Sequence, residues 1–132
     1  MPSSSTPPAE PPSIDGLLEQ VRAGLPPRPG PEELERIVAA GGLLVDIRPI
    51  GQRERDGELP GAIVIDRNVL EWRLDPASPN RIPEVDGYDQ QIVVVCNEGY
   101  ASSLAAETLQ RIGLHRATDL DGGYQGWRNP GK

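Results

Sequence analysis

The sequence predicts an α/β domain in which helices flank a central, mostly parallel sheet of about five strands. Two observations lead to this fold class. Short apolar runs suited to buried strands recur along the chain, and segments with helical spacing of apolar residues lie between them. Strands that alternate with helices form parallel sheets, because each parallel pair needs a crossover connection. The 132 residues suffice for one such domain with an additional tail.

The N-terminal part of the chain has the composition of a tail. Residues 1–13 are rich in Pro and Ser and cannot bury enough apolar surface to offset the entropy of ordering them. Residues 14–22 carry apolar side chains at helical spacing, and the Pro-rich stretch that follows ends this helix. The short helix either docks on the domain or stays free of it. We expect a tail over residues 1–30 and a domain over residues 31–132.

The predicted elements of the domain follow one another in order. Pro31 suits the first turn of a helix, which Gly41 ends. Residues 103–112 predict a second helix that stops at Gly113, and residues 75–90, rich in Pro and Asp, predict a long surface loop. Short apolar runs predict the buried strands: residues 43–47, 62–65, 91–96 and the weaker run 117–120.

Charge and composition exclude several classes of function. A net charge of −7 disfavours nucleic acids and anionic membranes as partners, because both select basic patches. No apolar stretch is long enough to span a bilayer, and the first residues have none of the features of a signal peptide. A single Cys forms no internal disulfide and, with a single His, makes no zinc site. We therefore expect a cytoplasmic, reduced protein without a bound metal.

Cys96 is the candidate nucleophile. It ends the most apolar predicted strand, and a helix begins a few residues later. In parallel sheets, ligands bind beyond the carboxyl ends of the strands. Gly99 allows a sharp turn that can aim backbone N–H groups inward, and the helix N-terminus adds positive charge, so the loop favours a thiolate. The alternative is a buried structural Cys at the end of a strand.

Four motifs stand in order along the chain: Leu44-Val45-Asp46-Ile47-Arg48; Glu54 with Gly57-Glu58-Leu59-Pro60-Gly61-Ala62; Val93-Val94-Val95-Cys96 through Ser103; and Asp121-Gly122-Gly123-Tyr124-Gln125-Gly126-Trp127. They resemble the Asp-x-Arg strand, the Glu followed by Gly-His-Ile-Pro-Gly-Ala, the active-site loop and the closing Gly-Gly-x-x-x-Trp segment of single-domain rhodaneses, a sulfurtransferase family. The resemblance extends from residue 31 to residue 128. It implies a rhodanese-like fold for this region.

The resemblance also implies a reaction. The Cys96 thiolate takes the outer sulfur of a donor such as thiosulfate or a persulfide, and a cyanide or thiol acceptor then removes it. A protein can serve as donor or acceptor, and no metal or organic cofactor is needed. The implied scaffold residues are Asp46 and an Arg48–Glu54 ion pair. The implied substrate contacts are the loop amides and pocket side chains of Asn97, Glu98, Gly99, Tyr100, Ala101 and Ser102.

The active loop departs from the family pattern in charge. Many rhodaneses carry Arg or Lys where this chain has Asn97 and Ala101, and Glu98 adds a negative charge. The loss of one such cation can cost a dianionic donor about 1 kcal/mol or more. We therefore expect thiosulfate to be a poor donor unless cations come from elsewhere, with Arg67 and Arg73 as the candidates. Any role of the family's motif His is also absent, because Glu58 replaces it.

Other functions fit the sequence less well. A Cys-based phosphatase needs an Arg at the position of Ser102 to clamp phosphate, and a thioredoxin-type oxidoreductase needs a second Cys. The serious alternative is a catalytically quiet rhodanese-like module that carries sulfur or binds a protein. The missing loop cations favour that module, whereas the presence of Cys96 and Gly99 favours the enzyme.

Overall fold

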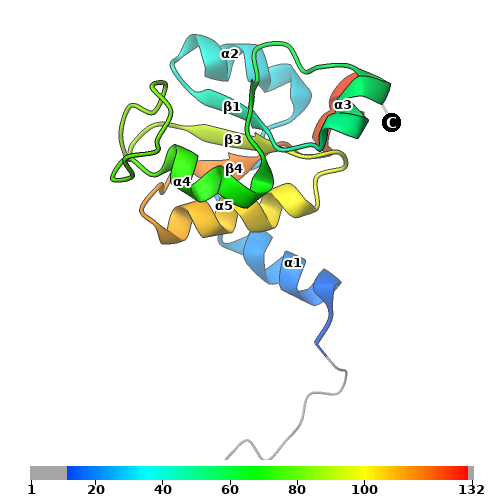
Figure 1. Ribbon diagram of the computed structural model, residues 1–132. Coiled ribbons are helices and arrows are strands. Elements are labelled where there is room, and N and C mark those ends of the chain that lie inside the picture. Colours follow the sequence, from blue (N-terminus) through cyan, green and yellow to red (C-terminus); the bar gives the residue numbers. More distant parts are fainter. Residues whose placement is uncertain (1–11, 131–132) are drawn as a thin grey trace, which may run out of the picture.

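The computed structural model describes residues 12–130 as a parallel sheet with helices on both faces (Figure 1). The strands are β1 (Leu43–Asp46), β2 (Ile63–Val64), β3 (Ile92–Val95) and β4 (Ala117–Asp119), in the spatial order β2-β1-β3-β4. Every neighbouring pair is parallel. The α/β fold class is confirmed, but the sheet has four strands in the described part of the chain and not about five. The other described segments are helices or loops, and residues 75–90 form the expected long connection.

Two layers of helices cover the sheet. The helices are α1 (Ile14–Ala23), α2 (Leu34–Ala39), α3 (Ile50–Asp56), α4 (Leu70–Leu74), α5 (Ala101–Arg111) and α6 (Gly123–Arg128), with 3₁₀ turns at Pro31–Glu33 and Arg67–Val69. One face carries α4 and α5, and α1 lies outside α5 (Figure 1). The other face carries α2 and α6. None of the helices between residues 12 and 130 combines the length and apolarity needed to cross a membrane.

The central strands are buried on both faces, which explains their unbroken apolar runs. All four residues of β1 and all four of β3 are buried. Val45 and Val94 pack toward α5, whereas Leu44 and Val93 pack toward α2. Because the strands are parallel, their carboxyl ends meet at one edge of the sheet, and the chain places its polar and nucleophilic groups there.

Helices α3 and α6 were not predicted, because neither has a stripe of apolar residues with helical spacing. No residue of α3 is buried. The two helices are joined through Asp56, whose backbone carbonyl accepts a hydrogen bond from the Tyr124 hydroxyl and whose carboxylate pairs with Arg128 at 2.8 Å. Hydrogen bonds from Arg55, Gln125 and Arg128 hold the pKa of Asp56 well below its usual range. The carboxylate therefore remains charged and keeps α3 next to α6 at ordinary pH.

The segment before the domain is docked and not free. Ser13 caps α1 by accepting a hydrogen bond from the Gly16 N–H, and α1 packs along α5. The extended residues that follow run past β4, where the Pro26 carbonyl accepts a hydrogen bond from Thr118 at 3.1 Å. The Pro29 carbonyl accepts a second one from the Asp121 N–H at 3.0 Å. The predicted Pro/Ser-rich stretch up to residue 11 lies outside the described residues.

Candidate active site

Cys96 lies at the carboxyl end of β3, directly before the loop that leads into α5. The residue is 7% exposed, and its sulfur is the acceptor for two backbone donors. The Gly99 N–H donates to Sγ at 3.1 Å and the Ser102 N–H at 3.4 Å. The N-terminus of α5, at Ala101, also points its partial positive charge toward this region. Two amides and a helix end thus face one sulfur, an arrangement that stabilises negative charge on it.

The loop over residues 96–102, called here the Cys96 loop, is held from behind by α6. The Cys96 carbonyl accepts a hydrogen bond from the Tyr124 N–H at 2.9 Å, and the Asn97 carbonyl accepts one from the Gln125 N–H at 3.0 Å. Gly99 has a φ of +90°, and its missing Cβ would lie 3.1 Å from the backbone N of Gly122. The closing Gly-Gly motif therefore positions the active-site loop by direct backbone contact.

A buried polar network extends from the sulfur toward the interior. Sγ lies 3.2 Å from the Ser102 hydroxyl, which donates to the Asp119 carboxylate at 2.7 Å. Ser103 also donates to Asp119, at 2.8 Å, and Arg28 pairs with Asp119 at 2.7 Å. Burial lowers the pKa of Arg28, but the hydrogen bond and charge of Asp119, with smaller contributions from Asp121 and Cys96, raise the pKa overall. Asp119 is fully buried and its charge is balanced within the network.

A second arginine from the N-terminal segment reaches the same loop. Arg22, in the last turn of α1, donates to the Gly99 carbonyl at 2.6 Å and to the Ser103 hydroxyl at 3.1 Å. Arg28 donates to the same carbonyl at 3.2 Å. Arg22, Arg28 and Asp119 were not predicted from the sequence. One signal was available, because an Asp inside a short buried strand needs a cationic partner, but the sequence alone did not say which arginine supplies it.

A pocket of about 310 Å³ opens beside the sulfur. Its walls come from the end of β1, from α3, from the 3₁₀ turn after β2 and from the Cys96 loop. The lining residues are Ile47, Arg48, Pro49, Gln52, Arg67, Cys96, Asn97, Glu98, Tyr100 and Ala101. Of the residues expected to contact substrate, the structure therefore brings Asn97, Glu98, Tyr100, Ala101 and Arg67 to this pocket, with Gly99 and Ser102 as amide donors behind it.

Three arginines differ from expectation in what they contact. Arg73 does not reach the pocket, because it lies on the exposed side of α4 and donates to the Asn80 carbonyl at 3.0 Å. The Arg48–Glu54 ion pair is wrong: Glu54 is exposed, and Arg48 pairs with Asp46 at 2.8 Å. Arg67 lines the pocket but already pairs with Glu71 at 2.9 Å, so its charge is largely balanced.

The pocket wall holds unused hydrogen-bonding capacity. Among the described residues, the buried polar side-chain atoms without a partner are Arg48 Nη1 and Gln52 Oε1. Both residues line the pocket next to Cys96. Such orphaned groups carry a free-energy cost that a bound polar ligand or water removes. Arg48 Nη1 can donate a hydrogen bond to a polar group close to the sulfur, whereas Gln52 Oε1 can only accept one.

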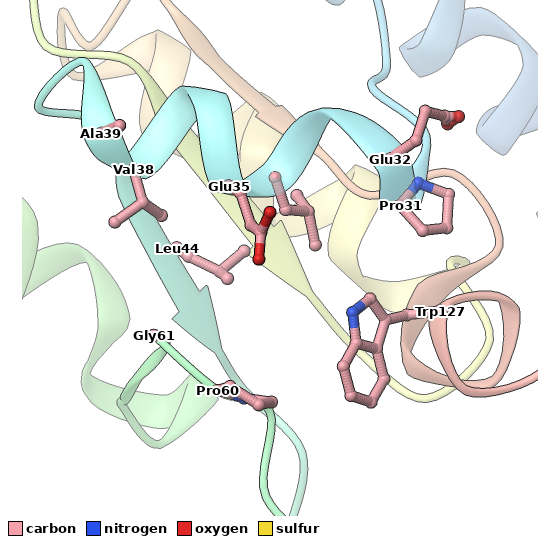
Figure 2. Close-up of a pocket in the computed structure, with 10 residues that line it drawn as sticks. Pro31, Glu32, Glu35, Val38, Ala39, Leu44, Pro60, Gly61 and Trp127 are labelled. Atoms are coloured by element: carbon pink, nitrogen blue, oxygen red, sulfur yellow. The ribbon is translucent and has the colours of Figure 1, made fainter.

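A larger hollow, of about 520 Å³, lies on the opposite face of the sheet. Figure 2 shows it between α2, the Pro60–Gly61 turn and the ring of Trp127, with Leu44 of β1 at its floor. Two glutamates, Glu32 and Glu35, stand at its rim, and its lining contains no nucleophilic side chain. The reactive chemistry of the chain therefore belongs to the smaller pocket.

Comparison with known proteins shows the family of this chain. The family model described as Rhodanese-like domain matches residues 30–130. A protein of Stutzerimonas stutzeri named thiosulfate sulfurtransferase GlpE is 30% identical over 99 residues, which cover 75% of this chain and 82% of that protein. A thiosulfate sulfurtransferase GlpE of Pseudomonas syringae is also 30% identical, over 74% of this chain and 83% of its own length.

Solved structures share the fold. A Rhodopseudomonas palustris protein of unknown function, described as a possible tyrosine phosphatase, is 31% identical with a TM-score of 0.77. It covers 94% of this chain and 95% of its own, so the similarity includes most of the segment before residue 30. A human single-domain sulfurtransferase, 24% identical with a TM-score of 0.66 over 81% of this chain and 99% of its own, shows the same fold.

Proposed function

The chain belongs to the Rhodanese-like domain family, and from that premise we propose that it is a sulfurtransferase that works through a persulfide on Cys96. The observation that carries the proposal is the pair of backbone N–H groups, from Gly99 and Ser102, directed at the Cys96 sulfur beside an open pocket. A buried structural Cys needs no such donors. Two inward-facing amides instead suit a sulfur that is an anion during its working cycle.

The reaction divides into two displacements at sulfur. The Cys96 thiolate attacks the outer sulfur of the donor, a new S–S bond forms, and the donor's own S–S bond breaks, so that thiosulfate would leave as sulfite. The persulfide then holds its charge on the terminal sulfur, next to the loop amides. An acceptor such as cyanide attacks that sulfur, leaves as thiocyanate and returns the Cys96 thiolate. Charge and atoms balance in both steps without a redox cofactor.

The charge of the pocket bears on the choice of donor. Its loop contributes the negative Glu98, and the charges of Arg67 and Arg48 are balanced by Glu71 and Asp46. A dianion such as thiosulfate therefore gains little attraction on entry. The Tyr100 side chain is 60% exposed at the pocket mouth, where it can contact a larger molecule. We propose that persulfides of small thiols or of proteins are better donors than thiosulfate.

A reducing compartment suits this cycle. Cys96 is the single Cys of the chain, so no internal thiol can resolve its persulfide, and an external acceptor such as a cellular thiol must do so. We therefore propose a cytoplasmic location, where such thiols are kept reduced. Phosphate chemistry is less well supported. A phosphatase needs an arginine at the position that Ser102 occupies, and Arg22 and Arg28 do not replace it, because both bind the Gly99 carbonyl behind the loop.

A donor panel read by intact-protein mass spectrometry tests the proposal. Incubation with a polysulfide or glutathione persulfide should add the mass of one sulfur atom, cyanide should remove it and release thiocyanate, and thiosulfate should label more slowly. Cys96→Ser should show no gain with any donor. If no donor labels the wild-type chain, the catalytically quiet binding module becomes the better account. Hydrolysis of an aryl phosphate without labelling would instead favour a phosphatase.

A further inference from the structure

The segment before the family domain sends two guanidinium groups to the Cys96 loop. Arg22 comes from the last turn of α1 and Arg28 from the extended stretch that follows. Both donate to the carbonyl oxygen of Gly99, at 2.6 and 3.2 Å, although they lie more than 70 positions away in sequence. The guanidinium of Arg22 also lies 5.9 Å from the ring centre of Tyr100. The residues matched by the family model begin only at residue 30.

We propose that Arg22 and Arg28 are positioning residues of the sulfur-transfer site, which orient the Gly99–Tyr100 peptide and supply the positive charge that the Cys96 loop lacks. This inference rests on the proposed function and deepens it. It makes the N-terminal segment a working part of the active site.

Peptide geometry links the two arginines to the conformation of the loop. In a trans peptide the C=O and N–H bonds point in opposite directions. Holding the Gly99 carbonyl toward α1 therefore turns the Tyr100 N–H away from α1. Gly99 is buried, and between residues 12 and 130 the one other donor to its carbonyl, besides the two arginines, is the Ser103 hydroxyl at 3.5 Å. Without the arginines this buried carbonyl would lack a good donor, and the resulting free-energy cost would favour rotation of the Gly99–Tyr100 peptide.

The Cys96 loop also lacks positive charge of its own. Residues 97–102 contain no cation and include Glu98. The carboxylate of Asp119 is also close, because the Ser102 hydroxyl contacts both this carboxylate and the sulfur. Arg28 balances Asp119, which leaves Arg22 as the arginine at the loop with no carboxylate within ion-pair distance among the described residues. The charged groups around the sulfur and their ion-pair partners are Arg22, Arg28, Asp46, Arg48, Arg67, Glu71, Glu98, Asp119 and Asp121.

Neither arginine lines the pocket beside Cys96, although both contact the loop that carries it. A positive charge close to a sulfur favours the anionic form of that sulfur. Arg22 and Arg28 share the same acceptor oxygen and the same side of the loop. Both arginines therefore stabilise a thiolate or persulfide from behind, where they do not obstruct the pocket.

The test follows the rate of Cys96 alkylation by iodoacetamide against pH in the full-length chain. Arg22→Gln should move the pH profile of the rate upward, and so slow alkylation at neutral pH several-fold, because it removes a positive charge from the loop. Arg28→Gln should act in the same direction. Arg111→Gln is the matched control, because it removes an exposed arginine at the other end of α5 and should leave the profile unchanged.

Arg22→Gln is the deciding variant, because Arg28→Gln also strips a buried carboxylate of its partner and can unfold the chain. Circular dichroism should show Arg22→Gln folded. A folded Arg22→Gln whose pH profile coincides with those of the wild type and Arg111→Gln would overturn the inference. Alkylation needs no sulfur donor, so its outcome for the arginines is independent of the persulfide labelling that tests the proposed function.

Discussion

Replacing Asp46 by alanine should lower the free energy of unfolding by about 3–5 kcal/mol, a large share of the stability of a domain this size. Both Asp46 and the side chain of Arg48 are fully buried. The carboxylate accepts bonds from Nε and Nη2 of Arg48 at 2.8–3.1 Å, and from its backbone N–H at 2.9 Å. Alanine removes the only carboxylate paired with this guanidinium among the described residues and leaves a buried positive charge. Urea unfolding followed by tryptophan fluorescence measures the loss.

The double variant Asp46→Leu with Arg48→Met separates charge from packing. Replacement of a whole buried ion pair by apolar side chains is often nearly neutral, so the double variant should be more stable than Asp46→Ala. Some cost remains, because Arg48 also donates to the Gly57 carbonyl at 2.9 Å and stacks 3.6 Å from the Tyr124 ring. A loss below about 1 kcal/mol for Asp46→Ala would show that the pair does not hold the end of β1.

Gly123→Ala should both destabilise the chain and remove the reactivity of Cys96. A Cβ at this position would lie 2.6 Å from the Gly99 N, 2.7 Å from the Cys96 carbonyl oxygen and 2.8 Å from the Glu98 carbonyl carbon. All three atoms belong to the backbone of the Cys96 loop and cannot move without moving the amides. Together with the φ of +61°, the crowding should cost about 2–4 kcal/mol. Persulfide formation should fall by more than ten-fold.

Gly126→Ala provides the matched control in the same helix. Its Cβ would meet nothing closer than the Asp121 carbonyl at 3.6 Å, an ordinary contact, and alanine is the better helix former. This variant should keep wild-type labelling and equal or higher stability. If Gly123→Ala behaved like Gly126→Ala, the close packing of α6 on the Cys96 loop would not matter for sulfur chemistry.

Much of the fold was predictable from local pattern. Strands β1 and β3 are buried on both faces, and such strands appear in sequence as unbroken apolar runs. Helix α5 could be predicted from its apolar spacing and the Gly after it. Helices α3 and α6 could not, because α3 has no stripe of buried apolar residues and α6 contains two glycines. Their positions depend on tertiary contacts such as those of Asp56.

In the candidate site, too, local contacts were predictable from the sequence and long-range contacts were not. Cys96, Gly99 and Ser102 are close in sequence, so the residue order strand, Cys, turn and helix was enough to predict amides near a sulfur. Contacts across the fold were not predictable in this way. Arg22 and Arg28 reach the loop only because α1 docks on α5, and no local pattern predicts that docking. The expectation for Arg73 rested on its position past the carboxyl end of a predicted strand, but helix α4 places the residue at the surface, where it donates to the Asn80 carbonyl.

The pH dependence of Cys96 alkylation in the wild-type chain tests the central claim most directly. If two amides and two arginines favour the sulfur anion, the folded chain should be alkylated at lower pH than the same chain unfolded. The same chain unfolded in urea supplies the reference, since it contains the same single Cys. A folded-state curve that coincides with the unfolded one, or lies above it, would contradict the account.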